Sequence, residues 1–341
     1  MKVLLIGGTG LISTAITRAL LARGADVTHF NRGKSQPEPL PGVKTIVGDR
    51  TDYAAFEAAI TEAGSFDCVI DMVGYKPADA ESVVRAFKGK IGHFVFCSTV
   101  DVYARPVPAF PIREDAPLGG RNDYGRDKVE CENILIAAHE RGDFPVTILR
   151  PAQTYRDPIL IVFAFNGGTA WVDRLRKNRP IIVHGDGQSL WCAAHADDVG
   201  PAFAVAAGNP QTFGKAYNVC GDQWMTWNDL YERAARILAA PPPRLVHIPT
   251  GFLVRVAPKA ASILAENFSH NNVFDNTAAH ADLAYRYTIP FEEGFRRGLE
   301  WHDAHGKIQN ADEAEPLHDR IVAAWERLSA VAAHDLQNNA S

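Results

Sequence analysis

The sequence contains no apolar run long enough to cross a membrane and no large excess of charge of one sign. The apolar run at residues 2–6 ends at two glycines and is shorter than the apolar core of a secretory signal. We therefore expect a cytoplasmic protein with no membrane contact. The net charge of −5 also gives no reason to expect nucleic acid as a partner.

Cysteine is scarce, and its spacing suits neither a metal site nor a disulfide framework. The five cysteines include no C-x-x-C pair, and several lie in apolar runs. This pattern predicts buried thiols in a reducing compartment. The histidines show no ligand spacing either, so we expect no metal.

The first half of the chain alternates short apolar runs with amphipathic helical stretches. Runs that are apolar at nearly every position, separated by helices, are typical of a parallel sheet covered on both faces. We therefore expect a doubly wound α/β domain with a parallel Rossmann sheet, whose ligands lie at the C-terminal ends of the strands. The predicted strands are residues 2–7, 25–31, 43–49, 67–73, 93–99 and 145–151.

After residue 151 the sequence becomes richer in Pro, Gly and aromatic residues, which indicates a smaller C-terminal α/β domain. We expect a dinucleotide-binding domain and a substrate-binding domain, followed by a C-terminal helical extension. Their expected ranges are 1–151 with a return near 194–221, then 152–193 with 222–306, and finally 307–341.

The predicted C-terminal extension carries one apolar stripe, formed by Leu317, Ile321, Trp325 and Leu328. Such a stripe needs an apolar partner. We expect it to pack against the body of the protein, and a homodimer contact is the alternative.

The first predicted strand leads directly into a glycine-rich turn, GGTGLIS, at residues 7–13. Gly7 and Gly10 have the spacing of a phosphate-binding turn at a helix N-terminus. Ser13 stands at the third position, which is usually glycine, and is small enough to let helix and strand approach closely. Because the turn follows a strand and opens a helix, it predicts dinucleotide binding.

The end of the second predicted strand normally offers a carboxylate to the adenine ribose of NAD. Here Asn31 stands at that place, followed by Arg32 and Lys34. Without the carboxylate a 2′-phosphate is not repelled, and Arg32 can pair with it, so the pattern favours NADP. A solvated basic loop is the alternative. Asp49, at the end of the third strand, either accepts from the adenine amino group or caps a helix.

Tyr124 and Lys128 stand four residues apart in a predicted helix, which places both side chains on one face. Ser98 and Thr99 end the fifth predicted strand, at the edge where the nicotinamide is expected. A strand-end hydroxyl, a phenol and a lysine beside that place predict a catalytic pair. A solvated helix edge is the alternative for the Tyr-Lys spacing alone.

With these motifs the chain resembles the extended short-chain dehydrogenase/reductase family, in its NAD-dependent sugar epimerase/dehydratase group. Three segments, FNRGK, GDR and YGRDKVECE, are most similar to an actinobacterial-type branch whose relatives include chloroplast proteins first described as RNA-binding. The matching segments cover nearly the whole chain in the family's order: GGTGLIS, GDRTD, STVDVY, YGRDK, LRPAQTY, VHGDGQ, HADDV, AYNVCG and YTIPFEEGFRRGLEW.

The resemblance implies a role for each central residue. Lys128 holds the nicotinamide ribose and, with the cationic ring, lowers the pKa of Tyr124. Tyr124 takes the proton of a sugar hydroxyl, and Thr99 hydrogen-bonds the same oxygen. Further cofactor residues implied are Leu11, Ile12, Arg50, Val73, Ser98 and Pro151, and further substrate residues are Asp101 and Gln153. Tyr75, which follows the fourth predicted strand, is expected to border the nicotinamide or the substrate, and a surface loop is the alternative.

Departures from the family pattern narrow the expected substrate. One acid, Asp101, stands where the family's dehydratases carry an Asp-Glu pair, which disfavours dehydration. Trp191 stands where nucleotide-sugar epimerases often carry a diphosphate-binding arginine. We therefore expect Trp191 to stack on the substrate, and Arg174 or Arg176 to hold a diphosphate if there is one. The apolar segment 155–168 predicts an unusual substrate lip.

The sequence thus predicts an NAD(P)-dependent epimerase that acts on a sugar or nucleotide sugar through a transient keto intermediate, with Tyr124 as base. An NADP(H)-dependent reductase or dehydrogenase of a small hydroxy or keto compound is the first alternative. A non-catalytic RNA-binding protein on the same fold is the second.

Overall fold

The structure is a computed structural model that describes residues 1–34, 40–157, 165 and 167–338. The chain splits into two compact units, each described below by itself. Unit 1 comprises Met1–Arg156, Cys192–Gln223 and Val273–Pro290, and unit 2 comprises Asp157–Trp191, Trp224–Asn272 and Phe291–Ser341.

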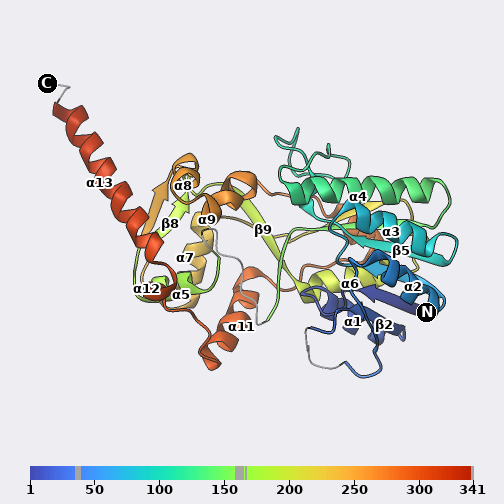
Figure 1. The fold of residues 1–341 in the computed structure, drawn as a ribbon. Coiled ribbons are helices and arrows are strands. Elements are labelled where there is room, and N and C mark those ends of the chain that lie inside the picture. Colours follow the sequence, from blue (N-terminus) through green and yellow to red (C-terminus); the bar gives the residue numbers. More distant parts are fainter. Residues whose placement is uncertain (35–39, 158–164, 166, 339–341) are drawn as a thin grey trace. The chain divides into compact units, whose positions relative to one another are not determined.

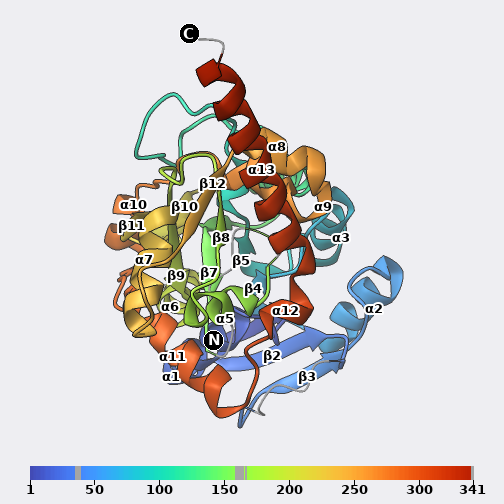
Figure 2. The same cartoon turned by 90° about the vertical axis from the view of Figure 1, so that its left-hand side faces the viewer.

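Unit 1 is built on a seven-stranded sheet with the strand order β10-β6-β5-β4-β1-β2-β3. Neighbouring strands are parallel throughout, which confirms the doubly wound fold (Figure 1). Figure 2 shows β3 at one edge, next to β2. The strands are β1 (Lys2–Ile6), β2 (Asp26–Asn31), β3 (Lys44–Val47), β4 (Phe66–Asp71), β5 (Ile91–Cys97), β6 (Val146–Pro151) and β10 (Ala216–Val219).

Helices cover both faces of this sheet because its strands are apolar on both sides. A short strand, β7 (Gln153–Tyr155), follows β6 and pairs in parallel with β9 (Leu190–His195). The helices of unit 1 are α1 (Ser13–Ala22), α2 (Tyr53–Ala63), α3 (Pro77–Phe87), α4 (Asp123–Glu140), α6 (Ala196–Ala206) and α10 (Thr277–Asp282), with short 3₁₀ turns η1 (Val100–Val102) and η2 (Pro210–Thr212).

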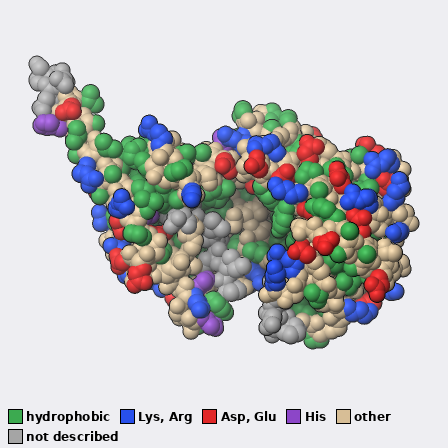
Figure 3. All heavy atoms as spheres, viewed as in Figure 1, with side chains coloured by type: hydrophobic (Ala, Val, Ile, Leu, Met, Phe, Trp, Pro, Cys, Tyr) green, Lys and Arg blue, Asp and Glu red, His purple; other side chains and the backbone are tan. Residues whose placement is uncertain are grey.

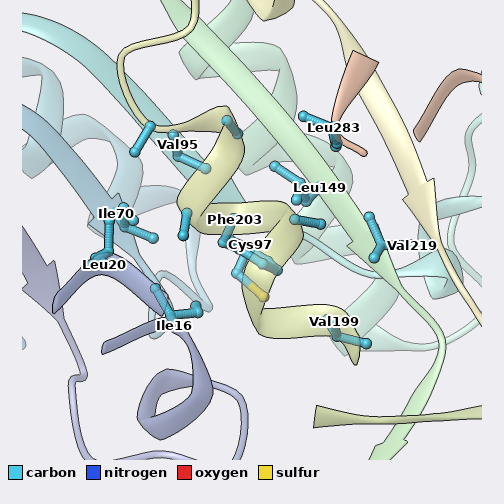
Figure 4. Close-up of a cluster of buried hydrophobic side chains, with 14 of the residues drawn as sticks. Ile16, Leu20, Ile70, Val95, Cys97, Leu149, Val199, Phe203, Val219 and Leu283 are labelled. Atoms are coloured by element: carbon cyan, nitrogen blue, oxygen red, sulfur yellow. The ribbon is translucent and has the colours of Figure 1, made fainter. Parts of the chain in front are cut away.

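Two apolar cores lie on the two faces of the sheet. On one face, Ile16 of α1 and Phe203 of α6 pack with strand residues such as Ile70 (Figure 4). On the other face, Phe56 of α2 and Leu135 of α4 pack against the opposite sides of the same strands. The strand order reverses beside β1, whose neighbours are β2 and β4, and ligands of such sheets bind at that point.

Unit 2 contains a two-stranded parallel sheet surrounded by helices. This sheet pairs β8 (Ile181–His184) with β12 (Leu245–Ile248), and a further strand of the unit, β11 (Trp224–Thr226), pairs with β9 instead. Its helices are α5 (Ala170–Arg176), α7 (Trp227–Ile237), α8 (Thr250–Val256), α9 (Pro258–Ile263), the π-helical turn η3 (Leu264–Phe268), α11 (Phe291–Ala304), α12 (Ala311–Ala314) and α13 (Pro316–Asn338).

The units differ from the expected domains at residues 273–290, which the sequence pattern assigns to the second domain. This segment belongs to unit 1 because its backbone is hydrogen-bonded there. The Ile112 amide donates to Val273 O at 2.8 Å, and the Cys220 amide donates to Asn276 Oδ1 at 3.1 Å. The expected extension at 307–341 is grouped with unit 2.

Helix α13 packs on unit 2 along its first half only. Ile321 is buried, and the Trp325 ring lies 5.3 Å from the ring of Phe252 in α8. Leu328 is 53% exposed, and residues 326–337 are all exposed. Packing against the body therefore accounts for Ile321 and Trp325 of the predicted stripe. Leu317 at its start is 41% exposed, and the homodimer contact remains a prediction for Leu317 and Leu328.

The cysteines, the helices and the surface charges can each be compared with what the sequence predicts. All five cysteines are free and buried, as predicted. No helix in the described ranges is both long and apolar enough to cross a membrane. Figure 3 shows acidic and basic side chains interspersed on the visible surface. The predicted substrate lip at 155–168 falls largely on residues 158–164 and 166, outside the described residues.

Candidate active site

A cavity of about 540 Å³ lies at the C-terminal ends of strands β1 to β4 in unit 1. This volume is typical of sites for small molecules and cofactors. Tyr75 lines this cavity together with Lys34 and many of the predicted cofactor residues. These cofactor residues are Gly7, Gly10, Asn31, Arg32, Asp49, Arg50 and Val73.

The glycine-rich turn forms one wall of the cavity. Gly7 has φ +84°, and a Cβ atom there would lie 2.5 Å from Cγ1 of Val73, so only glycine fits. The Ser13 hydroxyl donates to Gly7 O at 2.7 Å and fixes the turn at the start of α1. Leu11 and Ile12, half-buried, complete the turn. The backbone thus stays close to the cavity, as a pyrophosphate requires.

In the described part of the loop after β2, two cations, Arg32 and Lys34, line the cavity. Asn31 Oδ1 accepts from the Gly33 amide at 2.9 Å, which shapes the loop. Arg32 and Lys34 are exposed and line the cavity. A 2′-phosphate placed here would meet positive charge.

Asp49 lies across from these cations, at the end of β3. Hydrogen bonds from the amide and hydroxyl of Thr51 hold the pKa of Asp49 below its usual value, and Arg32 adds to the effect. The cap of α2 is instead Asp52, whose Oδ1 accepts from the Ala55 amide at 3.2 Å. The helix-cap alternative for Asp49 is therefore wrong, and the carboxylate faces the cavity.

Arg50 supports the floor of the cavity from a buried position. Its Nη2 donates to Asp71 Oδ2 at 2.8 Å and to Asp79 O at 2.9 Å, and its guanidinium lies 4.8 Å from the Phe56 ring centre. Asp71 in turn accepts from the Val73 amide at 2.9 Å. Sequence reasoning missed Asp71, although an acid that ends an apolar strand was a readable signal.

Helix α4 presents Tyr124 and Lys128 on one face, as the spacing predicts. Lys128 is 1% exposed, and its Nζ donates to Cys97 O at 2.6 Å. The Nζ atom lies 5.1 Å from the Tyr75 ring centre and 6.0 Å from that of Tyr124. Burial lowers the pKa of Lys128, and the neighbouring Cys97 and Asp71 act in the opposite direction.

Thr99 and Tyr124 meet at the end of β5. Thr99 Oγ1 accepts from the Asp101 amide at 3.2 Å and also shares a side-chain hydrogen bond with Tyr124. A hydroxyl can accept one hydrogen bond and donate another, so Thr99 can accept from the Asp101 amide and still donate its hydrogen to a neighbouring oxygen. Tyr124 is 40% exposed, and the Tyr75 ring lies 6.4 Å from it. The pair lies next to the cavity because Tyr75 lines it.

The protein alone does not lower the pKa of Tyr124. Burial, the largest cause, raises it, and the hydrogen bond with Thr99 only partly offsets that rise. Tyr124 is therefore protonated at neutral pH in this structure. The lowered pKa that the resemblance implies requires further positive charge beside the phenol.

Ser98 is buried, and its side chain points into a polar network. Its hydroxyl donates a short hydrogen bond to Glu132. Arg150 donates to the same carboxylate from Nη2 at 2.6 Å and from Nε at 3.0 Å. Sequence reasoning missed Glu132 and Arg150, although Glu132 lies four residues after Lys128 on α4 and Arg150 directly precedes Pro151.

The predicted substrate residues of unit 2 are engaged within that unit. Trp191 is 2% exposed and stacks on Trp227, with ring centres 4.8 Å apart. Arg174 is fully buried and forms an ion pair with Asp319. Arg176 pairs with Asp303 at 2.6 Å. The stacking and diphosphate roles stay predictions, and each requires the side chain to leave its present contacts.

The remaining predicted residues lie in unit 1. Gln153 begins β7 and is half-buried, and Pro151 ends β6 in a buried position. Asp101 follows Thr99 within η1 and is half-buried. Over the residues that the structure describes, no group of three or more His, Cys, Asp or Glu side chains could hold a metal ion.

Comparison with protein families matches residues 3–220 to the model described as "NAD dependent epimerase/dehydratase family". The chain is 29% identical over 276 residues to 2'-dehydrokanamycin reductase of Streptomyces kanamyceticus, covering 81% of this chain and 77% of the relative. It is 28% identical over 260 residues to chloroplast stem-loop binding protein of 41 kDa b of Arabidopsis thaliana, covering 72% and 65%.

Solved structures share the fold at low sequence identity. The UDP-glucose 4-epimerase of Thermotoga maritima, solved with UDP-glucose, has a TM-score of 0.70 at 20% identity. The match covers 89% of this chain and 99% of that structure. At this identity the likeness concerns the fold alone.

Proposed function

Because the chain belongs to the NAD-dependent epimerase/dehydratase family of extended short-chain dehydrogenases/reductases, we propose that it interconverts a hydroxyl and a keto group on a sugar or sugar-like substrate. The convergence of Tyr124, Lys128 and Thr99 next to the unit 1 cavity carries this proposal. The family's members are NAD(P)-dependent, and bound NAD(P) supplies the hydride acceptor or donor.

The residues present fit that cofactor. The glycine turn, at which a Cβ on Gly7 would clash with Val73, leaves room for a pyrophosphate beside backbone amides. Asp49, with its pKa held low, can accept from the adenine amino group. The buried ammonium of Lys128 would hold the nicotinamide ribose, and Tyr75 would border it.

In the oxidation direction, Tyr124 accepts the proton of the substrate hydroxyl. A phenol can do so at neutral pH only if its pKa falls, and the Lys128 ammonium, 6.0 Å from the ring centre, favours the phenolate. Thr99 donates its hydrogen to the reacting oxygen and orients it. In reverse, Tyr124 returns the proton to the developing alkoxide.

Epimerisation is the first form of this chemistry. The keto intermediate is reduced again within the same site, from its opposite face, without net use of cofactor. Several relatives named UDP-glucose 4-epimerase support this form, as does the single acid at Asp101, which disfavours dehydration.

Net reduction is the second form, and the cavity offers a specific observation for it. Arg32 and Lys34 line the cavity beside Asn31, and this arrangement favours NADP(H), the cofactor of many reductions. Similarity to a relative named 2'-dehydrokanamycin reductase points the same way. RNA binding stays a third prediction, against which the net charge of −5 argues.

Isotope tracing tests the proposal and separates its two forms. The purified enzyme is incubated with deuterium-labelled NADPH and a panel of keto sugars, and with NADP⁺ and a panel of sugars and nucleotide sugars. A reductase transfers the label to the product, whereas an epimerase forms an epimer without net cofactor consumption. If the Tyr124→Phe variant, purified in parallel, shows the same products at the same rate, the proposal is wrong.

A further inference from the structure

His29 is a buried polar residue beneath the glycine turn. It lies in β2, in register with Leu5 of β1, and is 6% exposed. Burial lowers the pKa of its imidazole from 6.5 to about 4, so the ring is neutral at physiological pH. An apolar side chain would fill the same space without the cost of desolvating a polar ring, and the proposed reaction makes no use of the imidazole. Packing alone therefore does not account for a histidine at this place.

The ring of His29 packs directly against Gly8, the second residue of the turn. A Cβ atom on Gly8 would lie 2.3 Å from Cγ and 2.5 Å from Cδ2 and Nδ1 of the imidazole. Gly8 is not among the glycines with positive φ, so the ring and not the backbone conformation excludes a side chain there. The next residue of β2, Phe30, accepts from the Gly7 amide at 2.9 Å through its carbonyl oxygen. Two consecutive residues of β2 thus hold the turn.

A chain of hydrogen bonds leads from the same ring to α1 and back to the turn. Thr17 Oγ1 donates to Ser13 O at 2.8 Å, so it accepts from His29 Nε2, 2.9 Å away. These bonds assign the ring hydrogen to Nε2. Ser13 Oγ in turn donates to Gly7 O at 2.7 Å. The imidazole therefore contacts the turn through Gly8 and is linked to it a second time through α1.

We propose that His29 is a positioning residue for dinucleotide binding. Its ring supports the glycine turn, and its hydrogen bond to Thr17 fixes the N-terminal part of α1, so that the backbone amides there are in place before a pyrophosphate binds. Donors that are already ordered bind an anion more tightly, because less conformational freedom is lost on binding. The inference rests on the proposed function, because it concerns the cofactor of the same site.

The His29→Leu variant separates positioning from packing. Leucine is similar in size and needs no hydrogen bond in the core, so the urea midpoint should stay the same or rise. The dissociation constants of NAD⁺ and NADP⁺, measured by calorimetry on the full chain, should both rise by roughly threefold to tenfold, as the loss of one hydrogen bond allows. The factor should be the same for both dinucleotides, because both carry the pyrophosphate.

The Thr17→Val variant breaks the same hydrogen bond from the other side. It should weaken the binding of both dinucleotides as much as His29→Leu does, and the two changes combined should weaken it no further. The matched control is Thr61→Val on α2. Thr61 is exposed and donates to Glu57 O at 2.9 Å, which is the same bond to the fourth preceding residue that Thr17 makes. This control should leave both dissociation constants unchanged.

The contact between Gly8 and the ring is tested by adding a methyl group. Gly8→Ala should weaken the binding of both dinucleotides about tenfold, because the new Cβ atom displaces the turn from the imidazole. Gly8→Ala combined with His29→Ala should regain part of this affinity, because the methyl group no longer meets a ring. Gly251→Ala on α8, where a Cβ atom would meet nothing within 4 Å, is the control and should change neither dissociation constant.

The outcomes distinguish this inference from the proposed function. If His29→Leu and Thr17→Val bind both dinucleotides as tightly as the wild type, the inference is overturned and the proposed function stands. A Gly8→Ala/His29→Ala variant weakened by the product of the two single effects also overturns the inference, because the two residues would then act independently. A wild-type protein that binds neither dinucleotide overturns the inference together with the proposed function.

Discussion

Lys128 is buried, and in the proposed reaction its ammonium acts on both the cofactor ribose and the Tyr124 phenol. Its Nζ donates to Cys97 O at 2.6 Å and lies close to the rings of Tyr75 and Tyr124. Burying an ammonium costs desolvation energy, and a buried lysine beside a cavity is therefore expected to have a functional role. The charge is available both to a ribose and to the phenol.

Lys128→Met should therefore impair binding and chemistry together. The methionine fills similar space without the ammonium, so both the ribose contact and the electrostatic support of the Tyr124 phenolate are lost. We expect a weaker cofactor dissociation constant and a kcat lowered about 10²-fold or more. Unchanged cofactor affinity, measured by fluorescence titration, would contradict the double role.

Arg32 determines the cofactor preference if the loop after β2 binds a 2′-phosphate. Arg32→Ala should weaken NADP binding by about tenfold, because a charge-assisted pair is lost, and should leave NAD binding nearly unchanged. The matched control is Arg23→Ala, an exposed arginine at the C-terminal end of α1. A wild-type enzyme that binds NAD more tightly than NADP would show that Arg32 is only a solvated loop residue.

At the scale of elements, α4 joins the site to the core of unit 1. Its exposed first turn carries Tyr124, and its buried face carries Lys128 and Glu132. Glu132 receives bonds from Ser98 and Arg150, which come from the ends of β5 and β6. The helix is thereby tied to both strands whose C-terminal ends bear the reacting groups.

Glu132→Gln should destabilise the protein strongly. The substitution leaves the buried Arg150 guanidinium without its carboxylate, and breaking such a pair on one side typically costs about 3–5 kcal/mol. Glu130→Gln, an exposed position on the same helix, is the control and should change the free energy of unfolding by less than about 0.5 kcal/mol. Equal urea midpoints for the two variants would contradict this account of the network.

The elements of unit 1 could be predicted because buried parallel strands leave a plain signal. Each of the six predicted apolar runs overlaps one observed strand, from β1 to β6, although β4 and β5 begin one and two residues before the predicted runs. The glycine turn lies where the sequence places it. The spacing of Tyr124 and Lys128 likewise transfers directly into a shared helix face.

The features that could not be predicted depend on packing between residues far apart in the chain, which a local sequence pattern does not indicate. Glu132 looks like an ordinary helix-surface acid in the sequence and is buried only because Arg150 meets it across the sheet end. The sequence predicts that Trp191 stacks on a ligand, but in the structure its ring stacks on that of Trp227. Residues 273–290 return to unit 1 through hydrogen bonds to residues that are distant in the chain, among them Ile112, Cys220 and Asp198, and no local sequence pattern indicates this return.

At the scale of the whole molecule, burial lowers the pKa of four described histidines, His184 included, and raises the pKa of two described carboxylates, Glu315 and Glu114. Burial lowers the pKa of His29 and of His93 from 6.5 to about 4, and that of His318 to about 3. Each of these histidines is held neutral in the folded protein. Its contribution to the stability of the fold is therefore present above pH 6.5 and is lost as the pH falls. Glu315, whose pKa burial raises to about 7, acts in the opposite direction.

The free energy of unfolding should therefore fall between pH 6.5 and pH 4, because four such histidines oppose two such acids among the described residues. The measurement is urea unfolding at several pH values within this window. His93→Gln, which removes one of the titrating groups, should flatten the slope. A free energy that stays constant or rises as the pH falls would show that these histidines are not held neutral.

In the proposed reaction, Tyr124 is the group that exchanges a proton with the substrate. The most direct measurement compares Tyr124→Phe with the wild type for both turnover and cofactor dissociation constant, on the substrate that isotope tracing identifies. We predict a loss of kcat of about 10²–10⁴-fold with a cofactor dissociation constant within about twofold of the wild type, because the phenol acts on the substrate's proton and not on the cofactor. A variant that turns over at the wild-type rate would contradict the central claim.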